Sequence, residues 1–324
     1  MKPFKWGLLL TSFLLVLGLN NARAETPRDQ PAPLLPWGAT PENIPGYLII
    51  EGDIQVPIDQ DPRAAPFTDS LWPGGRVVYE WDGNVTPEHR TNMRNAMAQW
   101  EAVANVAFIE QGDCGIIHCV HIQESNENSS AVGRQFFTQY VNIFNWGSPF
   151  IICHELGHTL GLYHEQSRSD RDTYVRINWD QIQSGEGDNF NREDGSGRYG
   201  PYDFDSVMHY GQFDFAIGDQ PTITVLPPNQ DWQTRIGQRD HLSRMDQMIM
   251  NFLYSQPNWR FVDASYSGIF QIGTFFNPFR DFVVGVNNTP NGGALWVQPG
   301  SYMARGTFTR RMTWQAPLGG VTLH

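Results

Sequence analysis

The sequence contains few cysteines, no basic run and only one long apolar stretch. Among its 324 residues, 22 lysines and arginines stand against 34 aspartates and glutamates, a formal net charge of −12. Proteins that bind nucleic acid or an anionic membrane surface usually carry a basic patch or stripe, and this sequence has none. We therefore expect no nucleic-acid partner. The length exceeds what one hydrophobic core usually needs, so we expect one large domain with additional segments.

The one long apolar stretch lies at the N-terminus. Lys2 and Lys5 give it a positive start, residues 6–19 are mostly apolar, and small residues surround Ala24. This pattern is typical of a secretory signal peptide over residues 1–24. An uncleaved anchor is the alternative, although the apolar run is short for a membrane span. We predict a secreted, extracellular protein that has no membrane span after signal removal.

The three cysteines are an odd number for an exported protein, so one of them is free or pairs between chains. Cys114 and Cys119 are near enough in sequence to close a small local loop. Cys153 can instead be buried and inert. With at most one disulfide within the chain, the fold depends on packing or on bound ions.

The segment with the most chemistry carries three histidines and one glutamate within eleven residues. On a helix, His154 and His158 are four positions apart and project from one face. Gly161 can end that helix in a left-handed conformation that a residue with a Cβ resists. The chain can then turn and bring His164 to the same point. Glu155, between the first two histidines, can reach a water held there.

This spacing predicts a catalytic zinc site. Three neutral imidazoles leave one coordination position open, as catalytic zinc requires. Water in that position acidifies from a pKa of about 15.7 to roughly 7, and Glu155 can take its proton and pass it to the leaving amine. Chance histidines at a helix end are the alternative interpretation. Copper or cobalt can also occupy three imidazoles, but we expect one Zn²⁺ held by His154, His158 and His164.

The residues that follow resemble a known family. Residues 164–172 read His-Glu-Gln-Ser-Arg-Ser-Asp-Arg-Asp, and residues 206–211 read Ser-Val-Met-His-Tyr-Gly. With the zinc motif, these segments resemble the astacin family of metzincin metalloendopeptidases, over residues 40–256 and most densely over 150–211. The resemblance implies an α+β fold, with a two-lobed catalytic domain, a twisted mixed sheet and a zinc helix.

The resemblance also implies roles for single residues. Met208 would form the apolar floor of the methionine turn, and Tyr210 would be a movable fifth zinc ligand that swings away to stabilise the oxyanion. In the zymogen, Asp53 would place its carboxylate on the zinc; a plain Gly-Asp turn is the alternative interpretation. Relatives often favour an acidic residue just after the scissile bond through a basic cleft residue, which the sequence does not locate.

An activation site is expected near Arg63. Cleavage there by a trypsin-like protease would leave Ala64 as the new N-terminus. By resemblance, the freed ammonium would be buried against Glu165. If Glu165 pairs with Arg168 or Arg171 instead, no N-terminal linkage is needed.

We divide the chain into four segments. They are a signal peptide (1–24), a propeptide (25–63), an astacin-like zinc peptidase domain (64–256) and a small β-rich segment of unknown role (257–324). Within the peptidase domain we expect strands over 76–81, 106–109 and 119–122, a helix that begins at Thr86-Pro87-Glu88, and a closing helix over 239–254. Residues 131–143 resemble the edge strand of astacins, which can bind an extended peptide by strand addition.

The C-terminal segment is read as turns and strands. Residues 285–286 indicate a turn and residues 292–302 a turn, a strand and a turn, which faintly resembles the opening coils of a parallel β-helix. The segment carries no zinc ligands. The lone histidines elsewhere are assigned no metal: His89, His118, His121, His209 and His241.

Taken together, the sequence predicts a secreted zinc endopeptidase made as a zymogen, acting on protein or peptide substrates. Two other classes stay open. One is a binding or adhesion protein with an inactive peptidase domain, and the intact zinc motif weighs against it. The other is zinc-assisted hydrolysis of a non-peptide bond, and the expected edge strand weighs against that.

Overall fold

The structure is a computed structural model that describes residues 47–57, 71–115, 117–193 and 200–324. The expected signal peptide, much of the expected propeptide and the activation site at Arg63 lie outside these residues. All described residues belong to one unit of the chain. Among them, none of the helices combines the length and apolar character that crossing a membrane requires.

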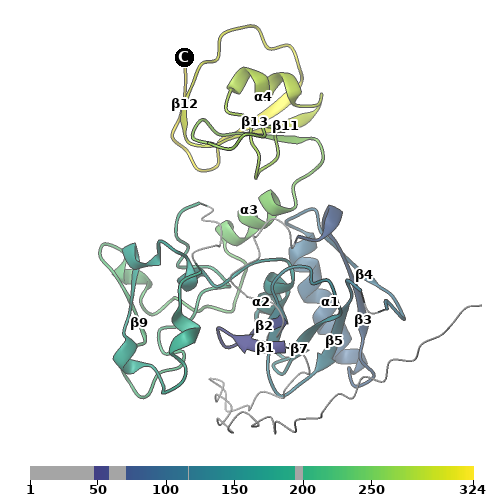
Figure 1. Ribbon diagram of the computed structural model, residues 1–324, viewed down its shortest axis with the longest axis vertical. Coiled ribbons are helices and arrows are strands. Elements are labelled where there is room, and N and C mark those ends of the chain that lie inside the picture. The colour runs from purple at the N-terminus through teal and green to yellow at the C-terminus, as the bar shows by residue number, and fades with distance from the viewer. Residues whose placement is uncertain (1–46, 58–70, 116, 194–199) are drawn as a thin grey trace, which may run out of the picture. The chain divides into compact units, whose positions relative to one another are not determined.

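A mixed sheet of seven strands forms the first part of the molecule, in the order β1-β2-β6-β7-β5-β3-β4 (Figure 1). Its strands are β1 (Tyr47–Ile50), β2 (Ile54–Pro57), β3 (Arg76–Trp81), β4 (Ala107–Glu110), β5 (Val120–Glu124), β6 (Ser129–Ala131) and β7 (Gln139–Ile143). β3 runs parallel to β4 and β5, and β5 runs parallel to β7, whereas β6 is antiparallel to β7. The expected strand β3 is confirmed, and the expected strands over 106–109 and 119–122 are shifted by one or two residues.

Two helices pack together beside this sheet: α1 (Pro87–Glu101) and α2 (Pro149–Thr159). α1 begins as expected, because the Thr86 side chain accepts a hydrogen bond from the His89 backbone N–H at 3.2 Å. Its Trp100 is fully buried and donates its indole N–H to the Cys153 carbonyl of α2 at 3.0 Å. Burying a side chain of that size contributes roughly 1.5–3 kcal/mol. This contact fixes α2, which carries the zinc motif.

A second hydrophobic core lies in the part of the chain after α2. It surrounds β8 (Val175–Ile177) and β9 (Ile223–Val225), which are antiparallel. Met208 belongs to the first core and Tyr210 to the second, so the segment between them joins the two lobes. Short 3-10 turns occur at Pro73–Gly75, Glu165–Ser167, Arg171–Thr173, Trp179–Gln181, Gly187–Phe190 and Gln230–Trp232.

The closing helix is shorter than expected: α3 covers Arg244–Leu253 and not residues from 239 onward. A capping box sets its start, because Ser243 Oγ accepts from the Asp246 N–H and Asp246 Oδ2 accepts from the Ser243 N–H, both at 2.9 Å. Asp246 also accepts from Ser206 Oγ at 2.6 Å and from the Val207 N–H at 2.9 Å. The helix start therefore anchors the methionine turn.

The C-terminal segment contains two small parallel sheets. One comprises β10 (Trp259–Val262), β11 (Gly293–Val297) and β13 (Met312–Gln315), and the other β12 (Gly300–Tyr302) and β14 (Val321–Leu323). The expected turn at 285–286 is wrong, because these residues lie in α4 (Phe282–Asn288), where the Asp281 side chain caps the helix and Phe282 is buried.

Candidate zinc site

The end of α2 brings the histidines together. His154 and His158 lie on its last two turns and are buried. Gly161, with φ +106°, ends the helix in the conformation expected of it. Gly157 leaves room for the methionine turn, because a Cβ at this position would lie 2.7 Å from Met208 Sδ. The chain then reverses and places His164 beside the other two.

The three imidazoles converge through their Nε2 atoms. His154 Nε2 lies 3.2 Å from His158 Nε2 and 3.2 Å from His164 Nε2. The side chains of the three histidines are at most 3% exposed. Asp53 completes the cluster, in which all four ligand atoms lie within 4.8 Å of one another.

The other ring nitrogen of each histidine already has an acceptor. His154 Nδ1 lies 2.8 Å from the Val207 carbonyl, and His158 Nδ1 lies 2.8 Å from the Leu162 carbonyl. His164 Nδ1 lies 2.8 Å from Glu51 Oε2. A neutral imidazole that donates from Nδ1 has a lone pair on Nε2, so the three neutral rings together can direct three lone pairs at one point away from water. A cation removes their mutual repulsion, and this donor set suits zinc.

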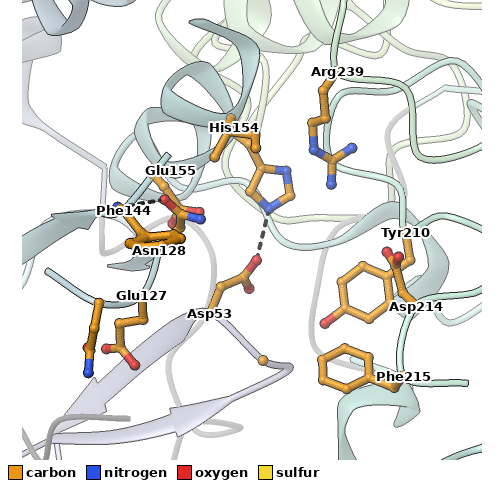
Figure 2. A pocket seen from close by; sticks show the side chains of 13 residues that line it. Asp53, Glu127, Asn128, Phe144, His154, Glu155, Tyr210, Asp214, Phe215 and Arg239 are labelled. Atoms are coloured by element: carbon orange, nitrogen blue, oxygen red, sulfur yellow. Dashed lines mark hydrogen bonds and ion pairs between the residues drawn. The ribbon is translucent and has the colours of Figure 1, made fainter. Parts of the chain in front are cut away.

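Glu155 follows the first histidine of the cluster on α2 and lines the same cavity. It is buried, and its Oε2 makes no hydrogen bond within the described part of the chain. Burial, and then the charge of Asp53, raises the pKa of Glu155 well above its ordinary value. Glu155 lines one cavity with Asp53, Tyr210 and Arg239. Figure 2 shows the Asp53 carboxylate pointing at His154 within this cavity.

The β1–β2 turn enters the site from the segment that precedes the expected peptidase domain. Gly52 has φ +78°, and a Cβ there would lie 2.6 Å from Phe215 Cζ, so the turn needs glycine. The Tyr210 hydroxyl donates a short hydrogen bond to the Glu51 carbonyl oxygen. The carboxylate of Asp53 lies 3.1 Å from His154 Nε2. The turn therefore contacts both the histidine cluster and the expected fifth ligand.

The charges of the turn alter the pKa values of the site. Burial lowers the pKa of His154 to about 3 and also lowers that of His158. Burial acts in the same direction on His164, but Asp53 and Glu51 outweigh it and raise the pKa to about 9. Burial opposes ionisation of Asp53, yet the three histidines hold its pKa well below the ordinary value. In the absence of metal, Asp53 and His164 thus form the ionised pair.

Glu165, expected to receive the new N-terminus, is paired in this structure. It lies 3.1 Å from Arg168 Nη1 and accepts from the Asp203 N–H at 2.8 Å. Burial raises the pKa of Glu165 to about 8, against the charge of Arg168. The Arg171 guanidinium instead pairs with Asp172 at 3.2 Å and donates to the carbonyls of Gln166 and Phe190.

Five other histidines, those assigned no metal from the sequence, lie outside the zinc cluster and have structural partners. Their partners are Glu124 for His89, Gln135 for His118, Glu80 for His121, Tyr202 for His209 and Asp205 for His241. The cysteines take one of the arrangements left open by the sequence. Cys114 and Cys119 form a disulfide, and Cys153 is free and buried, with its thiol pKa raised to about 12 by that burial.

Three residues of the site were not assigned a role from the sequence: Glu51, Asp214 and Arg239. Arg239 and Asp214 line the cavity on the far side of the zinc centre from Glu155 (Figure 2). Both come from loops after the methionine turn, and nothing in their spacing indicates the site. Glu51 could have been found, since it stands two positions before Asp53 in an apolar run where a carboxylate needs a partner.

Comparison with known proteins agrees with this geometry. The model of the Astacin peptidase family matches residues 65–255. High choriolytic enzyme 2 of Oryzias latipes is 32% identical over 225 residues, covering 67% of this chain and 78% of the relative. Tolloid-like protein 1 of Homo sapiens is 36% identical over 213 residues, covering 60% of this chain and 20% of that protein.

Among solved structures, high choriolytic enzyme 1, a hatching enzyme zinc-protease from Oryzias latipes, matches with a TM-score of 0.53 at 32% identity. The match covers 58% of this chain and 95% of that one. The family match and the buried cluster of three histidines thus agree on both the fold and the metal. The chain belongs to the astacin family of zinc metalloendopeptidases.

Proposed function

We propose that this zinc metalloendopeptidase is exported and made as a zymogen, in which Asp53 blocks the centre until the propeptide is removed. The observation that carries the proposal is the position of the Asp53 carboxylate. Its oxygens lie 3.1 Å, 3.6 Å and 3.2 Å from Nε2 of His154, His158 and His164. A carboxylate at this point takes the coordination position that a catalytic water needs.

In the processed enzyme, His154, His158 and His164 would hold one Zn²⁺. The ion would supply Lewis acidity, which makes a water in the site acidic enough to lose a proton near neutral pH. Glu155 accepts a proton from the attacking water at Oε2, the oxygen that has no hydrogen bond within the described residues. It then donates that proton to the amine that leaves.

Tyr210 and Met208 support the reaction in different ways. The Tyr210 phenol donates a hydrogen bond to the developing oxyanion, where a preorganised donor has a large effect. In the described form that hydroxyl is held by the Glu51 carbonyl, so it becomes available when the turn leaves. Met208 packs against Gly157 as an apolar floor and fixes the helix that carries two ligands.

The propeptide also covers β6, whose last residue, Ala131, begins the segment expected to be the edge strand. β2 pairs with β6 in parallel, with Ile54 opposite Ser130 and Gln55 opposite Ala131. An extended substrate binds such an edge by adding itself as a strand. Since β2 occupies β6, substrate and propeptide compete for one set of backbone hydrogen bonds.

Activation follows from cleavage near Arg63 by a trypsin-like protease. The family resemblance implies that the new N-terminal ammonium at Ala64 then pairs with Glu165. Glu165 is already paired with Arg168, the arrangement in which no N-terminal linkage is needed, and burial raises its pKa to about 8. A second cation would favour its ionised form. We also propose that residues 64–256 are the peptidase domain and 257–324 a separate β-rich segment.

Arg239 gives this enzyme a preference for an acidic residue just after the scissile bond. Its side chain lines the cavity opposite Glu155, and its Nη1 donates to the His209 and Gln238 carbonyls. Those contacts leave other guanidinium N–H groups for a carboxylate, which arginine can bind through two parallel hydrogen bonds.

Cleavage of a denatured protein by the purified full chain, before and after limited trypsin treatment, tests the proposal. We expect activity only after treatment, loss of activity with a zinc chelator, and a new N-terminus near Ala64. Asp53→Ala should be active without treatment. A silent Asp53→Ala chain that becomes active after trypsin would show that Asp53 does not maintain latency.

A further inference from the structure

We propose that Glu51 is a second anchor of the propeptide, whose carboxylate binds a site made by His164 Nδ1–H and Ser167 Oγ–H. The inference rests on the proposed zymogen function and goes beyond the contact of Asp53. Asp53 approaches the histidine cluster from the Nε2 side, whereas Glu51 holds the opposite side of one ring. The propeptide therefore contacts both ring nitrogens of His164.

The contacts of Glu51 are those of a specific carboxylate site. Its Oε2 lies 2.8 Å from His164 Nδ1 and accepts from Ser167 Oγ at 2.9 Å. The residue is only 2% exposed, and Oε1 has no hydrogen-bond partner within the described ranges. Hydrogen bonds to an ionised acceptor are shorter and stronger than neutral ones. Burying this carboxylate is unfavourable unless such donors meet it.

The other two histidines provide an internal comparison. His154 and His158 donate from Nδ1 to the Val207 and Leu162 carbonyls, which belong to the peptidase domain. Of the three, His164 is the one that donates to a carboxylate, and that carboxylate belongs to the propeptide. Removal of the propeptide leaves His154 and His158 with their Nδ1 acceptors, whereas His164 loses its acceptor. Latency and the orientation of the third ligand are therefore coupled through Glu51.

The backbone of Glu51 supports the same conclusion. Glu51 has φ +49°, a conformation that disfavours residues with a side chain. In this conformation its carbonyl oxygen accepts from the Tyr210 hydroxyl while its side chain turns to His164. One residue thus withholds the oxyanion donor and fixes the third ligand. Glycine at this position would relieve the backbone but would lose the carboxylate.

The test uses the zinc-loaded full chain and its variants Glu51→Gln, Ser167→Ala and Asp53→Asn. Glutamine keeps the size and the backbone conformation of Glu51 and removes only the charge. Gln55→Ala is the matched control, because Gln55 is a buried polar residue of the same hairpin that contacts Ser129 and not His164. Two readouts are used: activity before processing, and the proton NMR signals of the three imidazole Nδ1–H groups.

We expect Glu51→Gln and Ser167→Ala to raise activity before processing by about tenfold, the effect of weakening one charge-assisted hydrogen bond. In Glu51→Gln one Nδ1–H signal, that of His164, should move upfield while the other two stay. Gln55→Ala should leave all three signals in place, which separates the proposed role from general loosening of the hairpin.

Three other outcomes would contradict either the role of Glu51 or the zymogen proposal on which it rests. If Asp53→Asn is active without processing, but Glu51→Gln is latent with unmoved signals, Glu51 is no anchor and the zymogen proposal stands. If all three signals move together in Glu51→Gln, the residue acts only on the general fold of the site. If neither Asp53→Asn nor Glu51→Gln gains activity before processing, latency has another cause and both proposals fail.

Discussion

Within the part of the chain that the structure describes, two places gather metal-ligating side chains, and they differ in what those side chains are already bound to. One is the cluster of Asp53 with the three histidines. The other lies between β3 and β5, where Glu80, Cys114, Cys119 and His121 also have ligand atoms within 4.8 Å of one another. Residue types and distances alone do not separate the two places.

Pairing and burial separate them. In the zinc centre each histidine uses Nδ1 for an acceptor, so its buried Nε2 faces only the other two rings and the Asp53 carboxylate. In the second group, Glu80 Oε1 lies 3.0 Å from His121 Nδ1, and Glu80 Oε2 accepts a hydrogen bond from the Cys114 N–H. The sulfurs of Cys114 and Cys119 form a disulfide. The Glu80 and His121 side chains are 19% and 25% exposed. A metal centre therefore needs lone pairs that the fold keeps without partners.

The largest expected effect comes from removing one histidine at each place. His158→Ala should abolish zinc retention and, after processing, reduce peptidase activity to background, because two imidazoles no longer form the donor set. His121→Ala should keep one zinc per chain and full activity. Zinc content by atomic absorption and cleavage of a denatured protein measure both. Zinc loss in both variants would mean that the group containing His121 also contributes to zinc binding.

Carboxyl substitutions give the next largest effect. Glu155→Gln should keep zinc and lower the rate of cleavage by about 10²–10⁴-fold, the usual contribution of a general base. Glu80→Gln, which replaces a carboxyl paired with His121, should leave the rate unchanged. Steady-state kinetics of the processed enzymes provide the measurement. Retained activity in Glu155→Gln would remove this residue from the mechanism.

The comparison also shows what the sequence can predict. The spacing of His154, His158 and His164 around Gly161 predicts that these three side chains meet, because helix geometry and one left-handed residue bring them together. The family resemblance supplies the fold. Local signals are reliable here, since Thr86 caps α1 as expected.

Long-range contacts could not be predicted in this way. The start of α3 depends on Asp246. Its carboxylate also accepts hydrogen bonds from the Ser206 hydroxyl and the Val207 N–H of the methionine turn. Arg239 reaches the cavity from a loop whose sequence carries no periodicity. The helix α4 was missed because its glycine suggested a turn, whereas the burial of Phe282 favours a helix. Each of these depends on partners distant in sequence.

A smaller effect is expected from pH on the zinc-free full chain. Against the effect of burial, Asp53 and Glu51 raise the pKa of His164 from 6.5 to about 9. A raised folded-state pKa contributes stability that is complete below about pH 6.5 and is lost as the pH rises through 9. The melting temperature should therefore fall over this window, and Glu165, whose pKa burial raises to about 8, acts in the same direction.

Differential scanning calorimetry of the zinc-free chain between about pH 6 and pH 10 provides the measurement. Asp53→Asn should flatten the slope, because it removes the larger of the two charges that favour protonated His164. A melting temperature that rises with pH in this window would contradict the ion pair.

The smallest effect concerns the disulfide of the second group. Cys114→Ser opens a loop with a sequence separation of 5, which should lower the free energy of unfolding by about 2 kcal/mol. For a domain of this size the melting temperature should fall by roughly 4–8 °C, with zinc content and activity unchanged.

The intact chain under a mild dithiol reductant is the sharper experiment, because it frees both sulfurs while leaving every residue in place. If the reduced chain still binds one zinc, unpaired and buried lone pairs are what distinguish a metal centre in this fold. If the reduced chain binds a second zinc, the comparison fails. The disulfide would then be the one feature that prevents the group between β3 and β5 from binding metal.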